Sequence, residues 1–488
     1  MQLSWTWLVT VWFGLEVLVR IAAFFIVPKN RKPSSATAWL LLIMLFPTLG
    51  LFVFLLIGSP KLNKRRRAAQ DLMDVIIHGA VEEALANQKL RRFVKFDVPE
   101  RYQPFVSLNT TLSKLPAFSG NKVELLPGYD DILGRIASDI NNAKKFVHIE
   151  FFIIAMDEAT EQIFTAMEAA VLRGVEVRVL FDTVGAIQYP HYRDMKKRLT
   201  AAGIEWHPML PLRLPGRRYS RPDLRNHRKI AVIDANTGYT GSLNLVRRNY
   251  HRKDALYYDE LMVRIEGPVV AQLQGVFMTD WYAETDELLT RETSPALDYS
   301  LREAGSVLAQ AVPSGPGFEF ENNLKLFSSL IYSAKKRVVI TNPYFVPDES
   351  LLAAIITATQ RGVEVIIINS KIMDQRMVGH AQRSFYEELL RAGVQIYWYK
   401  WPILLHSKHM SIDDDICMIG SSNFDIRSFE LNLEISMIIY DQAVTKQLQK
   451  IEATYLSRSR RLTLEQWRQR PWHAKLLDNL ARLTAVLQ

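Results

Sequence analysis

The sequence predicts an α/β protein of two pseudo-symmetric α/β/α domains with mixed, largely buried sheets, preceded by a transmembrane hairpin of two helices. Three observations support this prediction: two long apolar runs near the start, an internal repeat in the remainder, and one polar motif in each repeat. The expected boundaries are residues 1–60 for the hairpin, 61–115 for an amphipathic linker region, 116–300 for the first domain, and 301–488 for the second domain with a C-terminal amphipathic helix.

The composition favours large folded cores and an anionic partner. The chain has 488 residues, of which 48% are hydrophobic and 10% aromatic, so extensive disorder is not expected. The formal net charge is +9, a value that suits either nucleic acid or acidic lipid as a partner. The single cysteine, Cys417, lies in an apolar run, which excludes a disulfide framework and is compatible with a cytoplasmic catalytic part.

Two apolar runs, residues 5–27 and 36–57, are each long enough to cross a hydrocarbon core of about 30 Å, and together they predict a membrane hairpin. Glu16 and Arg20 in the first run are four residues apart, so they lie on one helix face and can pair there. No basic segment or small-residue cleavage site marks this run as a removable signal peptide. Two buried helices of a soluble protein are the alternative, but apolar runs of this length are rare in soluble folds.

The basic residues beside the two runs predict the orientation of the hairpin. The connecting loop carries three cations, and the exit from the second run carries five. Because the more basic segment tends to stay inside, we expect a multi-pass chain whose termini and catalytic domains are all cytoplasmic.

An internal repeat begins beyond the linker. The segments A-K-K-F-V at 143–147, R-G-V-E-V at 173–177 and A-G-I at 202–204 return as A-K-K-R-V at 334–338, R-G-V-E-V at 361–365 and A-G-V at 392–394. Each half therefore reads as helix, strand, helix, strand, helix, strand, followed by a hairpin that carries the motif. This alternation is typical of helices that cover a largely buried sheet.

The motif in each half is a histidine and a lysine two residues apart, followed by an aspartate. The candidate catalytic residues are His227, Lys229 and Asp234 in the first half, and His406, Lys408 and Asp413 in the second. Alternate positions of a strand share one face, so the histidine and lysine supply a nucleophile or proton shuttle beside a fixed cation, as a phosphate ester requires. Each aspartate falls at a turn and off that face, so we interpret it as an anchoring residue of the motif rather than a reactant.

Each motif is followed by a second short strand that ends in G-S-x-N, with the glycine 14 residues after the histidine. Ser242 and Asn244 in the first half, and Ser421 and Asn423 in the second, alternate onto one face. They are candidates for substrate binding, because their hydroxyl and amide groups can donate to phosphate oxygens or steady the histidine. One H-x-K-x4-D motif is a weak signal, whereas two with the same spacing to G-S-x-N are a strong one.

Two carboxylates further along the chain are candidates for orienting the histidines. Residues 259–266 align with 434–441, which makes Asp259 and Glu434 equivalent. A carboxylate that accepts from the far ring nitrogen of a histidine fixes its tautomer and stabilises its charged form. The alternative for each is a surface acid at the start of a strand.

The paired motifs resemble those of the phospholipase D superfamily, and the rest of the chain, including the N-terminal hairpin, is similar to bacterial cardiolipin synthases. The resemblance implies transfer of a phosphatidyl group from one phosphatidylglycerol to another, with release of glycerol, at the bacterial inner membrane. It also implies a phosphatidyl-histidine intermediate, with His227 as nucleophile, His406 as acid and base, and neither a metal nor another cofactor. The symmetry of the motifs gives no independent reason for that order.

Three other functions are open alternatives. A phospholipase D-type hydrolase of membrane phospholipids would use the same residues with water as acceptor. A nuclease would share the motif and the basic charge but has no need of a membrane hairpin, and a non-catalytic scaffold would leave both histidine-lysine sets unexplained. The expected partners are therefore phosphatidylglycerol and anionic membrane lipid rather than nucleic acid, and assembly into a homo-oligomer is left open.

Two further segments are candidates for contact with lipid. Five arginines at 213, 217, 218, 221 and 225 precede the first histidine and are expected to meet anionic headgroups. Residues 472–487 place Trp472, Leu476, Leu480 and Leu483 on one helical stripe. Packing of that stripe on the globular domain is slightly favoured over an interfacial membrane helix.

Overall fold

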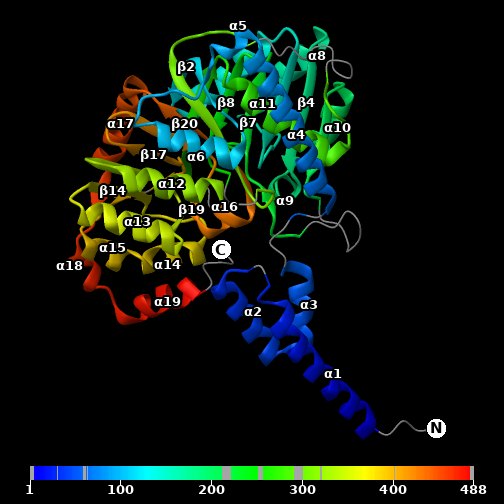
Figure 1. Ribbon diagram of the computed structural model, residues 1–488, viewed down its shortest axis with the longest axis vertical. Helices are drawn as coiled ribbons and strands as arrows, with labels where there is room; N and C mark the ends of the chain where they lie inside the picture. Colours follow the sequence, from blue (N-terminus) through cyan, green and yellow to red (C-terminus); the bar gives the residue numbers. More distant parts are fainter. Residues whose placement is uncertain are drawn as a thin grey trace.

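Two halves of similar construction form the α/β body of the protein. The computed structural model describes residues 5–29, 31–58, 62, 64–211, 221–250, 256–290, 301–318, 321–400 and 402–483. In Figure 1 the body occupies the upper part of the molecule, and three helices from the start of the chain project below it. The predicted α/β class with two repeated domains is confirmed.

The two halves contain sheets with the same strand order. In the first half the neighbouring strands are β2 (Ala117–Leu126), β10 (Met262–Glu266), β8 (Thr237–Gly241), β7 (Lys229–Ile233), β3 (Phe146–Phe151), β4 (Glu176–Asp182) and β5 (Glu205–Met209). In the second they are β11 (Val307–Ser314), β20 (Asn432–Tyr440), β18 (Ile416–Gly420), β17 (His409–Ile412), β12 (Arg337–Thr341), β14 (Glu364–Ser370) and β15 (Gln395–Tyr399). The last three strands of each sheet are parallel and the others antiparallel, so both sheets are mixed as predicted.

Helices cover both faces of each sheet. The first half has α7 (Tyr129–Asn141), α8 (Glu161–Leu172), α9 (Thr183–Ile187), α10 (Tyr192–Ala201) and α11 (Val270–Thr285). The second has α12 (Asn322–Ser333), α13 (Glu349–Gln360), α14 (Arg376–Ser384), α15 (Tyr386–Ala392), α16 (Ile426–Glu430) and α17 (Gln442–Ser457). Helix α7 follows the helical period, because Ile132, Leu133, Ile136 and Ile140 form its buried face. The sheets are thus largely buried, which explains why their strands are apolar on both sides.

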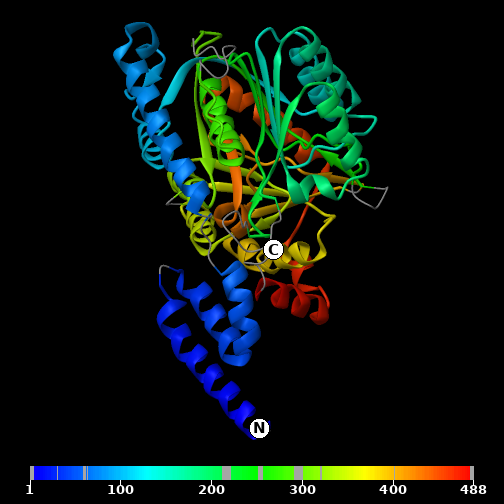
Figure 2. The ribbon, with the colours of Figure 1, turned by 90° about the vertical axis from the view of Figure 1, so that its right-hand side faces the viewer.

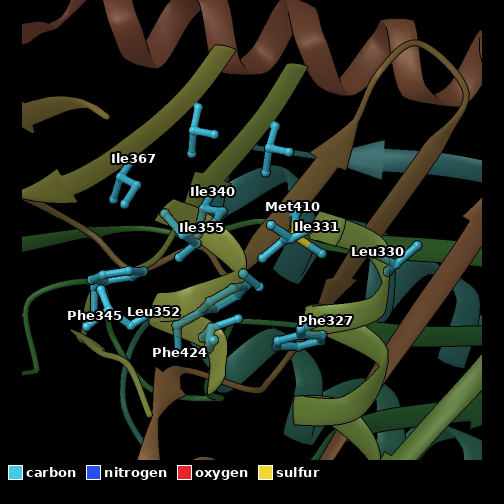
Figure 3. Packing of buried hydrophobic residues seen from close by; sticks show 14 of the residues in the cluster. Phe327, Leu330, Ile331, Ile340, Phe345, Leu352, Ile355, Ile367, Met410 and Phe424 are labelled. Carbon is cyan, nitrogen blue, oxygen red and sulfur yellow. The ribbon is translucent and has the colours of Figure 1, made fainter. Parts of the chain in front are cut away.

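The core of the second half shows how this packing is made. Phe327 and Ile331 on α12 belong to one buried cluster with Ile355 on α13 and the sheet residues Ile340 and Ile367 (Figure 3). All five side chains are at most 2% exposed. Burial on this scale contributes roughly 2 kcal/mol for each large aliphatic or aromatic side chain, so the sheet and its helices form one rigid unit.

The two halves are joined through their strands. Strand β2 pairs antiparallel with β11, which makes the two sheets continuous. Two short strands also cross between the halves: β6 (Arg225–Asn226) lies parallel to β20, and β16 (Ile403–Leu405) lies parallel to β9 (Tyr257–Asp259). These crossing strands directly precede the two motif histidines.

The remaining described elements are short or lie at the periphery. They are α5 (Gln88–Arg91), β1 (Val94–Lys95), α6 (Gln103–Ser113), β13 (Phe345–Val346), β19 (Phe424–Asp425), β21 (Ser459–Arg461) and α18 (Leu464–Arg468). Helix α4 (Lys64–Ala86) occupies the predicted linker and buries Met73 against the first half. The last helix, α19 (Trp472–Leu483), packs on α14.

The N-terminal region differs from the predicted hairpin of two spanning helices. The first run forms α1 (Trp5–Ile26), which of the described helices is the one long and apolar enough to cross a membrane. The second run is divided into α2 (Pro33–Leu45) and α3 (Pro47–Ile57). Pro47 explains the break, because proline lacks the N–H that would continue the hydrogen bonding of α2.

Candidate functional site

Each motif histidine is held by the opposite half of the protein. The backbone N–H of His227, just after β6, donates to the carbonyl of Leu433 on β20 at 2.8 Å. The backbone N–H of His406, just after β16, donates to the carbonyl of Asp259 on β9, also at 2.8 Å. The sequence predicts that the histidine and lysine of each motif lie on one strand, but both histidines precede β7 and β17, and Lys408 also precedes β17. Their positions depend on both halves being folded together.

The side chain of each histidine also contacts the opposite half of the protein. Nδ1 of His227 lies 2.9 and 3.0 Å from the two carboxylate oxygens of Glu434. Nδ1 of His406 lies 2.9 and 3.0 Å from those of Glu260. A carboxylate on Nδ1 holds the proton there, so it leaves Nε2 of each ring free for chemistry.

The prediction that Asp259 orients a histidine is wrong by one residue. Ser242 and Ser421 donate their backbone N–H groups to Leu261 and Ile435, respectively, so these two residues are equivalent and Glu260 is the counterpart of Glu434. The carboxylate of Asp259 instead accepts from Tyr399 Oη at 2.9 Å and pairs with Arg248.

The serines of the G-S-x-N segments contact the glutamates. Oγ of Ser242 donates to Glu260 and Oγ of Ser421 donates to Glu434, each at 2.5 Å. A hydroxyl has a single hydrogen to donate, so these serines do not supply the phosphate donors that the sequence suggested. They fix the carboxylates that face the histidines, which is the other role the sequence allowed.

The asparagines of the same segments are buried close to the serines. Asn244 and Asn423 are 3% and 6% exposed, and Oδ1 of each has no hydrogen-bond partner among the described residues. A buried amide oxygen without a partner is costly, so these groups are available to a bound molecule.

The motif lysines occupy equivalent buried positions. Nζ of Lys229 donates to the carbonyl of His227, and Nζ of Lys408 donates to that of His406, both at 2.7 Å. Burial lowers the pKa of Lys229 to about 7 and that of Lys408 to about 8. Each lysine is thus fixed beside its histidine, as the two-residue spacing predicts.

The motif aspartates lie at the far ends of β7 and β17, away from the histidines. The carboxylate of Asp234 accepts from the backbone N–H groups of Lys144 and Lys145 at 2.8 Å and of Phe146 at 3.0 Å. Asp413 makes the equivalent bonds in the second half and also pairs with Arg101. Both aspartates have positive φ, a conformation that aspartate tolerates in turns. This geometry fits the interpretation that they anchor the turn.

Burial and the surrounding cations favour a neutral imidazole at His227. The pKa of His227 is lowered well below its usual value by burial first, and then by the charges of Lys229, Lys408 and His406. Burial also lowers the pKa of His406, while the Glu260 carboxylate opposes that shift. A neutral imidazole carries the lone pair that a nucleophile requires. Lys408 and His406 belong to the second half, and both contribute to the lowered pKa of His227. The two motifs therefore lie close enough to interact electrostatically.

Aromatic rings line the site around each histidine. Phe152 makes an edge contact with His227 at a centroid distance of 5.1 Å, and Tyr258 makes one with His406 at 5.4 Å. His227 retains 11% side-chain exposure and His406 4%. The first histidine is therefore the more accessible of the two.

Two of the five arginines in the loop before His227, Arg221 and Arg225, lie within the described residues. Both contact acidic side chains of the protein itself. Arg225 is buried and its guanidinium donates to Asp182 at 3.2 Å, and Arg221 pairs with Asp223. Arg213, Arg217 and Arg218 lie outside the described residues. The predicted contact with lipid headgroups therefore does not hold for Arg225.

Two imidazoles, each with a carboxylate on Nδ1 and a lysine beside it, lie where two homologous halves meet, and such groups can supply a nucleophile, an acid-base and fixed cations. That combination is typical of a phospholipase D-like enzyme.

Comparisons with known proteins identify the family. A family model described as "Cardiolipin synthase, PLD-like domain" matches residues 136–281 and 327–454, and one described as "Phospholipase_D-nuclease N-terminal" matches residues 17–59. Cardiolipin synthase A of Proteus mirabilis is 34% identical over 98% of this chain and 97% of its own. That of Pectobacterium carotovorum is 34% identical over 97% of each chain. The chain therefore belongs to the cardiolipin synthase family of phosphatidyltransferases.

A solved structure supports the fold separately. The crystal structure of phosphatidylserine synthase from Haemophilus influenzae Rd KW20 has a TM-score of 0.59 and 17% sequence identity, and the match covers 80% of this chain and 100% of that one. At this identity the likeness concerns the fold alone.

Proposed function

We propose that the protein makes cardiolipin by transferring a phosphatidyl group from one phosphatidylglycerol to a second, with release of glycerol. The observation that carries the proposal is the reciprocal arrangement of the site: His227 is held by Glu434 at 2.9 Å, and His406 by Glu260 at 2.9 Å. Full-length similarity to enzymes named cardiolipin synthase A supports this choice of substrates.

In the first step, Nε2 of His227 attacks the phosphorus of the donor lipid. The N–P bond forms, the bond from phosphorus to the glycerol oxygen breaks, and His406, which enters this step as an imidazolium, gives its Nε2 proton to that oxygen. The greater exposure of His227 supports its assignment as nucleophile, as the family resemblance implies. Glu434 on Nδ1 stabilises the positive charge that develops on the attacking ring.

In the second step, a phosphatidylglycerol replaces the released glycerol. His406 takes the proton from the hydroxyl of the acceptor, whose oxygen attacks phosphorus while the N–P bond breaks. The covalent intermediate keeps the transfer potential of the phosphodiester, so no nucleotide is consumed. Glu260 stabilises the protonated form of His406 before the first step and again after the second.

The lysines and asparagines complete the proposed site. Lys229 and Lys408 supply positive charge to the phosphoryl oxygens, whose negative charge increases in the transition state. Asn244 and Asn423 donate from Nδ2 to the same oxygens, or accept from hydroxyl groups of the glycerol moiety through their Oδ1 atoms, which are unpaired among the described residues. Ser242 and Ser421 position the glutamates and do not touch the substrate.

The reaction products test this function. Detergent-solubilised full-length protein should convert phosphatidylglycerol to cardiolipin and glycerol in equal amounts. Phosphatidic acid and glycerol as the main products would show a hydrolase instead. Cleavage of DNA without lipid turnover would show a nuclease.

We infer further that the protein is anchored in the membrane by α1, with the catalytic body at the cytoplasmic face. The apolar length of α1 and the matched N-terminal family segment support the anchor. The basic start of α4, Lys64 to Arg67, supports the orientation.

A further inference from the structure

We propose that α2 and α3 form a re-entrant hairpin, which enters and leaves the bilayer on the face that carries the catalytic body. Helix α1 then spans the membrane, so its N-terminal end lies on the opposite face. The proposal rests on the membrane anchoring inferred above but not on the reaction catalysed. It replaces the predicted topology, in which both termini are on the same side.

Contacts between distant residues show that the second apolar run folds back on itself. The ring centroids of Trp39 on α2 and Phe54 on α3 are 5.4 Å apart, and the guanidinium of Arg31 lies 4.8 Å from the Phe54 ring. In one straight helix, residues 39 and 54 would be about 22 Å apart along the axis. The end of α3 therefore returns to the level where α2 begins.

Gly50 makes this close return sterically feasible. A Cβ at position 50 would lie 2.8 Å from Cα of Ile43 and 2.9 Å from the carbonyl oxygen of Leu42. Only a residue without a side chain lets the two backbones approach this closely.

Both ends of the α2–α3 hairpin contact the catalytic body. At its start, Nζ of Lys32 lies 2.7 Å from Glu321 and 2.8 Å from Glu430. After its end, Leu62 packs against Leu224 and Leu431. Figures 1 and 2 show the same arrangement: the three helices meet the body at one end, and the N-terminal end of α1 lies farthest from it.

The lengths of the helices agree with a partial insertion. Helix α1 has 22 residues and is therefore about 33 Å long, enough for a hydrocarbon core of about 30 Å. Helices α2 and α3 have 13 and 11 residues, which gives about 20 Å and about 17 Å. Neither can span the bilayer.

A polar group in α1 satisfies the backbone at the hairpin tip. The break before Pro47 leaves carbonyl groups at the end of α2, and such groups are costly in lipid without a partner. Nε of Arg20 donates to the carbonyl of Met44 at 3.2 Å, and its guanidinium lies 3.6 Å from Glu16. The two charges that made the first apolar run unusual thus have a structural role at the tip.

The charge distribution favours this topology as well. Lys29, Arg31 and Lys32 now lie on the same side as the basic start of α4, whereas the predicted two-pass hairpin would place them on opposite faces. A topology with both basic segments on the inner face agrees with the positive-inside rule for both segments.

Single-cysteine labelling of the full-length protein in oriented membranes tests the topology. Cys417 is fully buried, so it does not react with a membrane-impermeant maleimide in the folded protein. Trp5→Cys should react from the face opposite the catalytic body, Lys29→Cys from the same face as the body, and Phe46→Cys from neither. Leu172→Cys, at an 89% exposed position on α8, reports the side of the body.

The outcome separates the topologies irrespective of enzymatic activity. Labelling of Trp5→Cys on the same side as Leu172→Cys, together with labelling of Lys29→Cys on the other side, would establish the two-pass hairpin and overturn the proposal. The transfer assay on the same membranes reports separately on the proposed function.

A second inference concerns α19, whose apolar stripe is not packed on the body. The buried residues of this helix are Asp478 and Ala481, and Asp478 lies 2.7 Å from both His380 on α14 and Arg470. The stripe faces outward, with Trp472 74% exposed and Leu483 81% exposed. The slightly favoured prediction that the stripe packs on the domain is therefore wrong.

We infer that α14 and α19 form a second contact with an anionic bilayer surface. Helix α19 lies at the end of the body from which α1 to α3 emerge (Figures 1 and 2), so its stripe continues the membrane-facing side set by the anchor. A pocket on α14 beside it is lined by Lys371, Arg376 and Arg383 together with Met373. Cations next to an apolar stripe suit phospholipid phosphates next to acyl chains.

Spin labels on the full-length protein in nanodiscs test this contact. A label at Leu480→Cys should be protected from a water-soluble nickel relaxant and reached by oxygen when the nanodisc contains phosphatidylglycerol. The label at Leu172→Cys should stay accessible to nickel. The double variant Arg376→Gln/Arg383→Gln should reduce the protection of Leu480→Cys. Equal nickel accessibility at positions 480 and 172 would overturn the inference.

Discussion

Oε1 of Glu434 lies 2.9 Å from Nδ1 of His227, although the two residues are 207 positions apart and belong to different halves of the protein. The reciprocal contact, between Glu260 and His406, has the same length. Neither half contains a complete histidine-glutamate pair. Each histidine-glutamate pair is therefore assembled from both halves of the protein.

Neutralising either glutamate should slow transfer strongly. Glu434→Gln and Glu260→Gln each remove the negative charge that stabilises an imidazolium, and a loss of about 10²- to 10⁴-fold in kcat is expected. Asp259→Asn is the matched control, because its carboxylate contacts Tyr399 and Arg248 instead of a histidine. We expect kcat of this control to stay within about tenfold of wild type. A greater loss in Asp259→Asn than in Glu260→Gln would contradict the assignment.

Removing a serine hydroxyl should affect the reaction rate more than substrate binding. Ser421→Ala frees the Glu434 carboxylate from a 2.5 Å hydrogen bond, so kcat should fall by roughly tenfold with KM little changed. Asn423→Ala removes an amide group proposed to contact the substrate and should raise KM. Steady-state kinetics of the two variants separates these roles. A raised KM with unchanged kcat in Ser421→Ala would show that Ser421 binds the substrate.

The buried lysines predict a loss of activity on the alkaline side. Lys229 and Lys408 have pKa values lowered by burial to about 7 and about 8, so the cations proposed to face the phosphoryl oxygens lose their protons as pH rises through this range. We expect kcat/KM to fall between about pH 7 and 9. A flat profile up to pH 9.5 would exclude this role.

The same lysines predict the opposite trend for stability. Their folded-state pKa values lie below the unfolded value of 10.5, so between about pH 7 and 10.5 the unfolded chain binds more protons than the folded one. Their contribution to the free energy of unfolding therefore rises with pH across that window. The difference in unfolding free energy between wild type and Lys229→Met, measured at several pH values, isolates this contribution. A difference that does not change with pH would contradict the lowered pKa of Lys229.

The motif aspartates should matter for stability more than for chemistry. Asp234→Ala removes the acceptor of three backbone N–H groups at a turn, which predicts a loss of about 2–4 kcal/mol in the free energy of unfolding. The variant should have a lower Tm but keep most of its transfer rate per folded molecule. A variant of normal Tm that lacks activity would make Asp234 part of the chemistry.

Filling the space at Gly50 should open the re-entrant hairpin. Gly50→Val places a side chain against the backbone of Ile43, so α2 and α3 must separate. In the double variant Trp39→Cys/Phe54→Cys, a short bifunctional thiol reagent should link the two positions, and the added Gly50→Val change should reduce the yield. Equal yields with and without the valine would show that the two helices do not approach each other at position 50.

The motif spacing was enough to predict that each lysine lies beside its histidine, but the sequence did not fix which acidic residue aligns with Glu434. Histidine and lysine two residues apart share a face in any extended segment, so their pairing follows from local geometry. Strands β10 and β20 are buried on both faces, so their apolar residues show no alternation that fixes the alignment. Glu260 was therefore missed in favour of its neighbour Asp259. The shared pattern of glutamate followed by an aliphatic residue was the available signal.

The crossing of β6 and β16 between the halves could not be predicted from sequence. Their partners lie far away in the chain, and nothing local in Arg225 or Asn226 indicates β20 as a neighbour. The sequence of the N-terminal hairpin does contain a local signal of its break, but the length of the second apolar run favoured a single spanning helix. Pro47 followed by Gly50 marks a break and a close approach inside an apolar run that otherwise reads as one spanning helix.

Rapid quenching of the full-length protein during turnover of phosphatidylglycerol, followed by mass spectrometric mapping, tests the central mechanism most directly. The account predicts a phosphatidyl group on the peptide that contains His227, absent from the His227→Ala variant, which should not turn over. An adduct on His406 instead, or undiminished cardiolipin synthesis by His227→Ala, would contradict it.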